Sequence, residues 1–233
     1  MARTATDGNR VRGVLLDVDG TLVDSNDAHA RAWVRALADC GTSVHFEDVR
    51  PLIGMGGDKL LPVAAGIDAD SPEGQRVERR RSEIVRAELL PMVRPFPRAA
   101  DLLAALRARS LRLVVASSAK DEELDKLLDV CGAKPFVEAR TSSDDADNSK
   151  PDPDIIHAAL AAIGLPAGEV LMLGDTPYDV EAAGKAGVGV VAFRCGGWGD
   201  ADLTGAVAVY DGPADLLANL DASPFGGSRT GGR

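Results

Sequence analysis

Acidic and basic side chains follow several short apolar runs of this sequence, at the points where strands would end. Asp17 and Asp19 open the stretch DVDGTLVDS directly after one such run, and Asp175 follows another. Lys150 lies in the segment SKPDPD. Three carboxylates gathered in one place repel one another, and the pKa of one is forced upward unless a cation lies between them. These residue types favour a hard divalent ion with oxygen ligands, and we expect Mg²⁺.

The same segments offer donors that could hold an anion beside the metal. They are the side chains of Lys150 and Ser117 and the backbone N–H groups near Gly20 and Thr21. A metal, a lysine and a carboxylate nucleophile around an anion suit phosphoryl transfer through an aspartyl-phosphate. The sequence therefore predicts an enzyme that acts on a phosphate group.

A parallel sheet is needed to bring these scattered residues together. Short apolar runs predict strands at residues 11–16, 111–116, 135–139, 170–173 and 188–193, with a possible edge strand at 206–210. Helical patterns alternate with them at residues 99–109, 122–131, 154–163, 180–186 and 214–220. In such α/β folds ligands gather outside the carboxyl ends of the strands, so the polar residues after each run are expected to converge.

The alternation is interrupted once, by a long helical stretch without a convincing strand. Residues 27–40 and 73–90 have the apolar spacing of amphipathic helices, and three prolines then close the stretch. The expected organisation is an α/β core of residues 11–26 and 95–222, a helical insertion of residues 27–94, hinges near 24–27 and 93–97, and disordered ends at 1–10 and 223–233.

Composition narrows the class of partner. The formal net charge of −10 argues against nucleic acid or an anionic membrane as the main partner. No apolar run is long enough for a membrane span, and the N-terminus has no apolar signal segment. The three cysteines are far apart and form no CxxC pair, which fits a reducing cytoplasm. The sequence leaves a monomer and a homodimer equally open.

Four motifs together resemble a known family. DVDGTLVDS, VVASS, SKPDPDI and GDTPYD are similar, in this order, to the four motifs of the haloacid dehalogenase-like superfamily. The resemblance covers about residues 11–217, including the helical segment, which would be the cap that this superfamily inserts after its first motif. It implies a Rossmann-like parallel-sheet core with an α-helical cap, and a phosphatase acting on a small phosphate ester in the cytoplasm.

The resemblance also implies roles for the core residues. Asp17 would be the nucleophile that attacks phosphorus, and Asp19 would protonate the leaving oxygen and later activate water. Mg²⁺ would be bound by the Asp17 carboxylate, the Asp19 backbone carbonyl and Asp175, and Asp179 would support the metal waters from outside.

Phosphate contacts are implied in the same way. Ser117, or its neighbour Ser118, would hydrogen-bond the phosphoryl oxygens, and Lys150 would pair with both the nucleophile and the phosphate. The backbone at Gly20 and Thr21 would complete the phosphate site.

Substrate-selecting residues are expected in the cap. His29 and Trp33 match a histidine and a tryptophan of sugar-phosphate members such as β-phosphoglucomutase, although packing between cap helices is the favoured role for Trp33. Gly54 and Lys59 lie in the glycine-rich loop IGMGGDK, which is either a specificity loop or an ordinary helix–helix turn. Lys59 also raises the possibility of a Schiff-base lysine as in phosphonoacetaldehyde hydrolase, which the surrounding sequence does not resemble. The basic run 79–81, flanked by glutamates, is expected to be a solvated helix face.

Two rival functions retain the same core residues. A phosphomutase of the β-phosphoglucomutase type more usually has an acidic residue where Gly174 stands, and it offers an arginine in the cap loop that IGMGGDK lacks. A catalytically idle protein that only binds a phosphorylated ligand is the rival of another class, and the complete set of carboxylates and lysine disfavours it.

Overall fold

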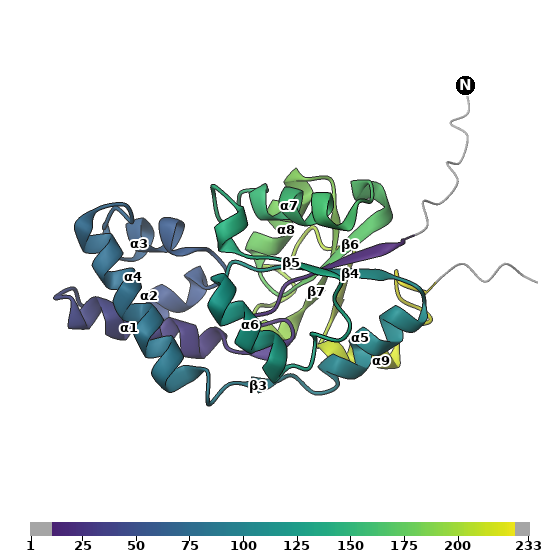
Figure 1. Ribbon diagram of the computed structural model, residues 1–233, viewed down its shortest axis with the longest axis horizontal. Coiled ribbons are helices and arrows are strands. Elements are labelled where there is room, and N and C mark those ends of the chain that lie inside the picture. The colour runs from purple at the N-terminus through teal and green to yellow at the C-terminus, as the bar shows by residue number, and fades with distance from the viewer. Residues whose placement is uncertain (1–10, 227–233) are drawn as a thin grey trace, which may run out of the picture.

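A parallel sheet forms the centre of the molecule (Figure 1). The computed structural model describes residues 11–226; the segment 1–10, predicted to be disordered, and residues 227–233 lie outside the described residues. The strands are β1 (Gly13–Leu16), β4 (Arg112–Ala116), β5 (Ala139–Thr141), β6 (Val170–Gly174), β7 (Gly189–Phe193) and β8 (Ala208–Tyr210). Their order is β5-β4-β1-β6-β7-β8, with every pair parallel. The Rossmann-like parallel sheet that the sequence predicts is thus confirmed.

Helices cover both faces of the sheet, as the buried apolar strands require. They are α5 (Ala99–Ala108), α6 (Asp121–Val130), α7 (Asp154–Ile163), α8 (Pro177–Lys185) and α9 (Pro213–Ala218). Successive residues of a strand point to opposite faces. Val14 and Leu16 of β1 therefore pack with α5, α6 and α9, while Leu15 packs with α7 and α8. Figure 1 shows α7 and α8 on the opposite side of the sheet from α5 and α9.

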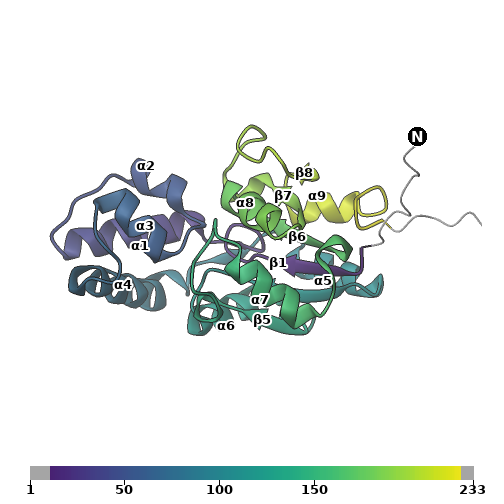
Figure 2. The same cartoon turned by 90° about the horizontal axis from the view of Figure 1, so that it is seen from above.

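A group of helices extends from one end of the sheet (Figure 2). It consists of α1 (Asn26–Asp39), α2 (Phe46–Val49), α3 (Gly57–Ala65), α4 (Pro72–Ile84) and a π-helical turn, Val85–Leu89. We call these helices the cap. Two short antiparallel strands, β2 (Val23–Asp24) and β3 (Arg94–Pro95), join the cap to the sheet. They lie where the sequence predicts hinges, although it predicts no strand at residues 94–95.

Two further sequence predictions need correction. The strand expected at 135–139 is displaced, because the segment up to residue 138 forms turns and only Ala139–Thr141 pairs with β4. The tail predicted to be disordered from residue 223 begins as ordered chain: the Phe225 side chain is 3% exposed and belongs to the apolar core. Burial of this large apolar ring holds residues 223–226 against the protein.

The sheet order places a crevice beside β1. The chain moves from β1 to β4 on one side and later returns to β6 on the other, so helices on the two faces diverge at this point. Within residues 11–226, no helix is both long enough and apolar enough to cross a bilayer.

Candidate active site

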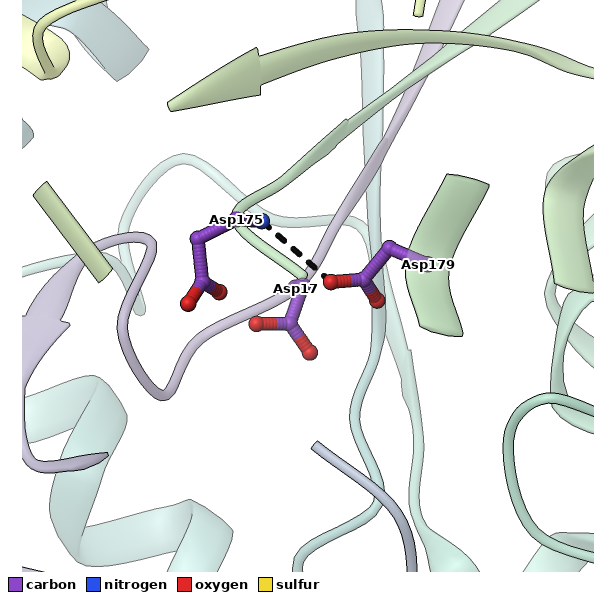
Figure 3. A group of neighbouring side chains, drawn as sticks. All are labelled: Asp17, Asp175 and Asp179. Carbon is purple, nitrogen blue, oxygen red and sulfur yellow. Dashed lines mark hydrogen bonds between the residues drawn. The ribbon is translucent and has the colours of Figure 1, made fainter. Parts of the chain in front are cut away.

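Three buried carboxylates meet at the carboxyl ends of β1 and β6 (Figure 3). Leu16 and Leu173 are register partners, so Asp17 and Asp175 emerge at the same edge of the sheet. Asp179 reaches them from the first turn of α8. One oxygen of each carboxylate lies within 4.8 Å of the others. The structure thus brings together Asp17 and Asp175, as expected, and places the Asp179 carboxylate beside them.

Asp179 belongs to this carboxylate cluster and also caps the N-terminus of α8. Its Oδ2 accepts hydrogen bonds from the backbone N–H of Asp175 at 3.2 Å, drawn in Figure 3, and from that of Thr176 at 3.0 Å. The Thr176 Oγ1 accepts from the Asp179 N–H in return, which completes a capping box. The other oxygen, Oδ1, lies 2.8 Å from the Lys150 ammonium. One carboxylate therefore fixes the helix and faces the lysine.

Lys150 is the cation of the site and is only 1% exposed. Its Nζ lies 2.7 Å from Asp17 Oδ1 and 2.8 Å from Asp179 Oδ1, and it donates to the Ala116 carbonyl at 3.1 Å. Two of its three protons therefore have hydrogen-bond acceptors, Asp17 and the Ala116 carbonyl, and Asp179 faces the ammonium as an ion-pair partner. Burial alone would lower the pKa of Lys150, but the charges of Asp17 and Asp179 outweigh it and raise that pKa. Lys150 is therefore held as a cation.

One lysine does not compensate three carboxylates. Burial, aided by the nearby Asp179 charge and opposed by Lys150, raises the pKa of Asp17 to about 7. Burial and the charges of Asp17 and Asp179 raise the pKa of Asp175 well above its ordinary value. The Thr21 Oγ1 lies 3.0 Å from Asp17 Oδ2 and 2.8 Å from Asp175 Oδ1, yet it has a single proton to donate. This one hydroxyl therefore cannot fully compensate both carboxyls.

These observations fit a divalent cation. Carboxylate oxygens that crowd one another and resist ionisation are a donor set that Mg²⁺ accepts, because the ion removes the repulsion. Asp17 and Asp175 are the side chains that would hold it, with the Asp179 carboxylate adjoining.

We expect Mg²⁺ to stabilise the protein more at about pH 8 than at about pH 5.5. The pKa of Asp17 is about 7 in the folded protein, above the ordinary value of 3.8 for an aspartate, so folding tightens the binding of its proton. The free energy of unfolding of the metal-free protein therefore falls through this group as pH rises from about 4 to about 7. Mg²⁺ competes with that proton. Thermal unfolding of EDTA-treated protein, with and without MgCl₂ at both pH values, measures the difference, and equal shifts would contradict it.

The Asp19 carboxylate is turned away from this cluster and toward the cap. Its Oδ1 accepts a hydrogen bond from Ser25 Oγ and lies 2.9 Å from His29 Nε2. Burial would raise the pKa of Asp19, but the hydrogen bonds of His29 and Ser25 and the nearby charge of Arg81 outweigh it and lower that pKa. Asp17 and Asp19 thus occupy different surroundings two residues apart. Gly20, at φ 75°, provides the left-handed turn that follows.

Arg81 extends from cap helix α4 into the cleft, which overturns the prediction of a solvated position for this one residue of the run 79–81; Arg79 is exposed, and Arg80 pairs with Asp39 at the surface. Its guanidinium donates to both oxygens of Glu123 at 3.0 and 2.8 Å and approaches His29 Nδ1 at 2.8 Å. Because an arginine can only donate, His29 Nδ1 accepts, and the ring proton lies on Nε2, facing Asp19. Glu123 is on core helix α6 and is 3% exposed. The sequence alone could not reveal this partner 42 residues away.

Replacing Arg81 with lysine is expected to lower kcat/KM by about tenfold, because an ammonium cannot reproduce the paired bonds to Glu123 together with the bond to His29. The matched control is Arg80→Lys, whose arginine pairs with the half-exposed Asp39 on the outer face of the cap. Steady-state hydrolysis of a phosphate ester by the two variants measures the effect. Equal losses in both would show that Arg81 has no special place in the cleft.

Two adjoining cavities lie between the cap and the core. One of about 60 Å³ contains Asp17, Asp19, His29 and Gly54, and one of about 300 Å³ contains Ser117. Ser118 lines both. The Ser117 Oγ accepts the Ala119 N–H at 3.1 Å, and the Ser118 Oγ is buried without a hydrogen-bond partner among residues 11–226. Both serines therefore lie at the cleft.

The glycine-rich cap loop lies directly over the core. A side chain at Gly54 would come within 2.8 Å of Thr176 and 3.0 Å of Tyr178, and its φ of 114° favours glycine as well. Trp33 packs in the cap as expected, with 5% exposed, and also lines both cavities. Glycine at residue 54 thus allows the cap to approach the strand ends closely.

Lys59 is not a cleft residue, contrary to its place among the expected substrate contacts. Its Nζ pairs with Asp152 at 2.8 Å on the outside of the cap–core junction, and it is absent from the linings of both cavities described above. The hydrogen bond to Asp152 raises the pKa of Lys59, whereas a Schiff-base lysine needs an uncharged amine. The structure therefore contradicts the Schiff-base interpretation.

Asn26 is a site residue that the sequence analysis missed. Its Nδ2 donates to Asp175 Oδ2 at 2.8 Å and to the Gly196 carbonyl at 3.1 Å. Gly196 passes so close that a Cβ there would lie 1.8 Å from the same Asp175 oxygen. An asparagine that opens a helix is normally interpreted as a cap, so no local signal marked it.

Comparison with known proteins agrees with this geometry. Residues 14–193 match the family described as haloacid dehalogenase-like hydrolase. A phosphoglycolate phosphatase of Rhodospirillum rubrum is 33% identical over 230 residues, which cover 94% of this chain and 95% of that protein.

Solved structures have a similar fold. A hydrolase from Pseudomonas syringae superposes with a TM-score of 0.84 at 28% identity, covering 91% of this chain and 98% of that one. CbbY from Rhodobacter sphaeroides, solved in complex with phosphate, superposes with a TM-score of 0.75 at 27% identity, covering 91% and 99%. The match over most of the chain, the sheet order and the carboxylates at the strand ends lead to one assignment: this chain belongs to the haloacid dehalogenase-like hydrolase family.

Proposed function

We propose that this enzyme hydrolyses a small phosphate monoester through an aspartyl-phosphate on Asp17, with Mg²⁺ as its cofactor. The observation that carries the proposal is the buried Lys150, whose ammonium lies 2.7 Å from Asp17 Oδ1 at the end of β1. A lysine held as a cation beside a buried carboxylate supports attack on an anionic substrate, which a lone carboxylate would repel. Relatives named as phosphatases support the same reaction.

The reaction would proceed in two displacements at phosphorus. An Asp17 carboxylate oxygen forms a bond to phosphorus while the bond from phosphorus to the ester oxygen breaks, and Asp19 gives that oxygen a proton. Water then attacks the phosphorus of the aspartyl-phosphate, Asp19 takes a proton from the water, and the Asp17 carboxylate leaves. Bound Mg²⁺ would supply positive charge to the phosphoryl oxygens.

The surroundings of the two aspartates suit these different roles. Lys150 holds one oxygen of Asp17 and fixes the plane of its carboxylate. Ser25 and His29 lower the pKa of Asp19. Once Asp19 has given its proton to the ester oxygen, its carboxylate is therefore readily left ionised, the form that takes a proton from water. Ser117, Ser118 and the backbone at Gly20 and Thr21 are the proposed phosphate contacts. Cap closure over the cavities would keep bulk water from the aspartyl-phosphate.

One contact favours hydrolysis over the phosphomutase alternative. A Cβ at Gly174 would lie 2.7 Å from the Asp179 Cβ and 2.9 Å from its Oδ2. An acidic side chain at this position, more usual in such mutases, would collide with the carboxylate that caps α8 and pairs with Lys150. Supplying a sugar bisphosphate and assaying isomerised product against free phosphate separates the two reactions.

Phosphate release from p-nitrophenyl phosphate and acetyl phosphate tests the proposal. We expect release with MgCl₂ and a loss of activity with EDTA that MgCl₂ restores. Folded protein that binds phosphate but releases none from either ester would instead support the ligand-binding alternative.

A further inference from the structure

The organic part of a substrate would lie in the larger cavity. This cavity of about 300 Å³ shares Trp33, Met55, Arg81 and Ser118 with the smaller one that contains Asp17 and Asp19. An ester whose phosphorus faces Asp17 would therefore extend its alcohol portion into the larger cavity. The side chains of that cavity determine which alcohols it accepts.

Negative charge predominates in this cavity. Four carboxylates line it, Asp58, Glu78, Asp144 and Asp147, against two cations, Arg81 and Lys120. Both cations are already paired: Arg81 with the buried Glu123, and Lys120 with Glu78 at 3.0 Å. Asp147 is exposed and makes no ion pair within the described part of the chain. A second anionic group on the substrate would meet like charges here and compete for cations that already have partners.

Hydroxyl groups, in contrast, find complementary partners. Five serines line the cavity: Ser82, Ser117, Ser118, Ser143 and Ser149. Ser117 and Ser118 are the proposed phosphate contacts, which leaves Ser82, Ser143 and Ser149 for hydroxyl groups of the substrate. Serine oxygens both donate and accept, and carboxylates accept from O–H groups. Trp33 and Ile155 add apolar surface for the C–H faces of a carbon chain or ring.

We infer that the alcohol portion of the substrate is neutral and rich in hydroxyl groups, a small polyol or sugar, without a carboxylate or a second phosphate. This inference rests on the proposed phosphatase function. It predicts discrimination against phosphoglycolate, the substrate for which several relatives are named.

Two matched pairs of esters test it. 2-Hydroxyethyl phosphate and phosphoglycolate differ only in a hydroxymethyl group against a carboxylate, and so do glycerol 3-phosphate and 3-phosphoglycerate. In both pairs we expect kcat/KM for the hydroxymethyl member to be at least about tenfold higher, because the carboxylate of the other member would meet like charges in the cavity. Equal or higher kcat/KM for the carboxylate members overturns the inference.

The double variant Asp144→Asn, Asp147→Asn tests whether the cavity charge is responsible. We expect the kcat/KM ratio within each pair to fall at least about threefold, because two like charges are removed near a partly solvated cavity. Asp70→Asn is the matched control, an exposed cap aspartate outside the cavity lining. A ratio unchanged in the double variant overturns the inference.

Acetyl phosphate is the control substrate that separates a failure of this inference from a failure of the phosphatase proposal. Hydrolysis of acetyl phosphate together with a preference for carboxylates overturns the neutral-substrate inference and leaves the phosphatase proposal intact. If the protein hydrolyses neither acetyl phosphate nor any of the four esters, the phosphatase proposal and the neutral-substrate inference are both overturned.

Discussion

Asp17→Asn is expected to abolish turnover, with kcat reduced by at least about 10⁴-fold, the scale of loss when an enzyme loses its nucleophile. An amide oxygen is too weak a nucleophile to form the bond to phosphorus. The variant should nevertheless remain folded. Replacing Asp17 removes repulsion from Asp175 and Asp179, and Lys150 retains Asp179 and the Ala116 carbonyl as partners. We expect an unfolding midpoint in metal-free buffer equal to or above that of the wild type.

Asp24→Asn is the matched control for this loss. Asp24 belongs to the same stretch, DVDGTLVDS, but it is an exposed residue of the connecting strand β2. We expect its phosphate release to stay close to that of the wild type. Comparable turnover by Asp17→Asn and the wild type, on any substrate the wild type hydrolyses, would disprove the assignment of the nucleophile.

Lys150→Met is expected to lower the free energy of unfolding by about 3–5 kcal/mol, the usual cost of removing one partner from a buried ion pair. The methionine fills most of the space but leaves Asp17 and Asp179 without their shared cation. Chemical denaturation of the EDTA-treated protein measures the loss. Added MgCl₂ should recover part of it, since a bound cation would again oppose the carboxylate charges.

The control for this variant is Lys59→Met. Lys59 and Asp152 form an ion pair between side chains that are 35% and 36% exposed, and such pairs contribute less than about 1 kcal/mol. If Lys150→Met cost no more than Lys59→Met, the buried lysine would not be compensating the carboxylates, and the electrostatic account of the site would be wrong.

The sequence was sufficient for the sheet and for the residues at its strand ends. Apolar runs such as 170–173 and the polar residues that follow them are local features, and a parallel sheet necessarily brings the ends of its central strands together. Asp17, Asp175 and Lys150 can therefore be grouped from the order of residues alone. The strand near residue 139 is displaced because turn residues before it are also apolar, and local hydrophobicity does not say which residues pair.

The tertiary structure decided which way each polar side chain faces and what it contacts. Asp19 turns to His29, Arg81 leaves a run of surface-like arginines to pair with Glu123, and Lys59 pairs outside the cleft. Each contact joins the core to the cap. The sequence determined the reactive groups because their types and order are written along the chain. Only the folded structure determined their partners, because burial and charge pairing arise between segments that are distant in sequence.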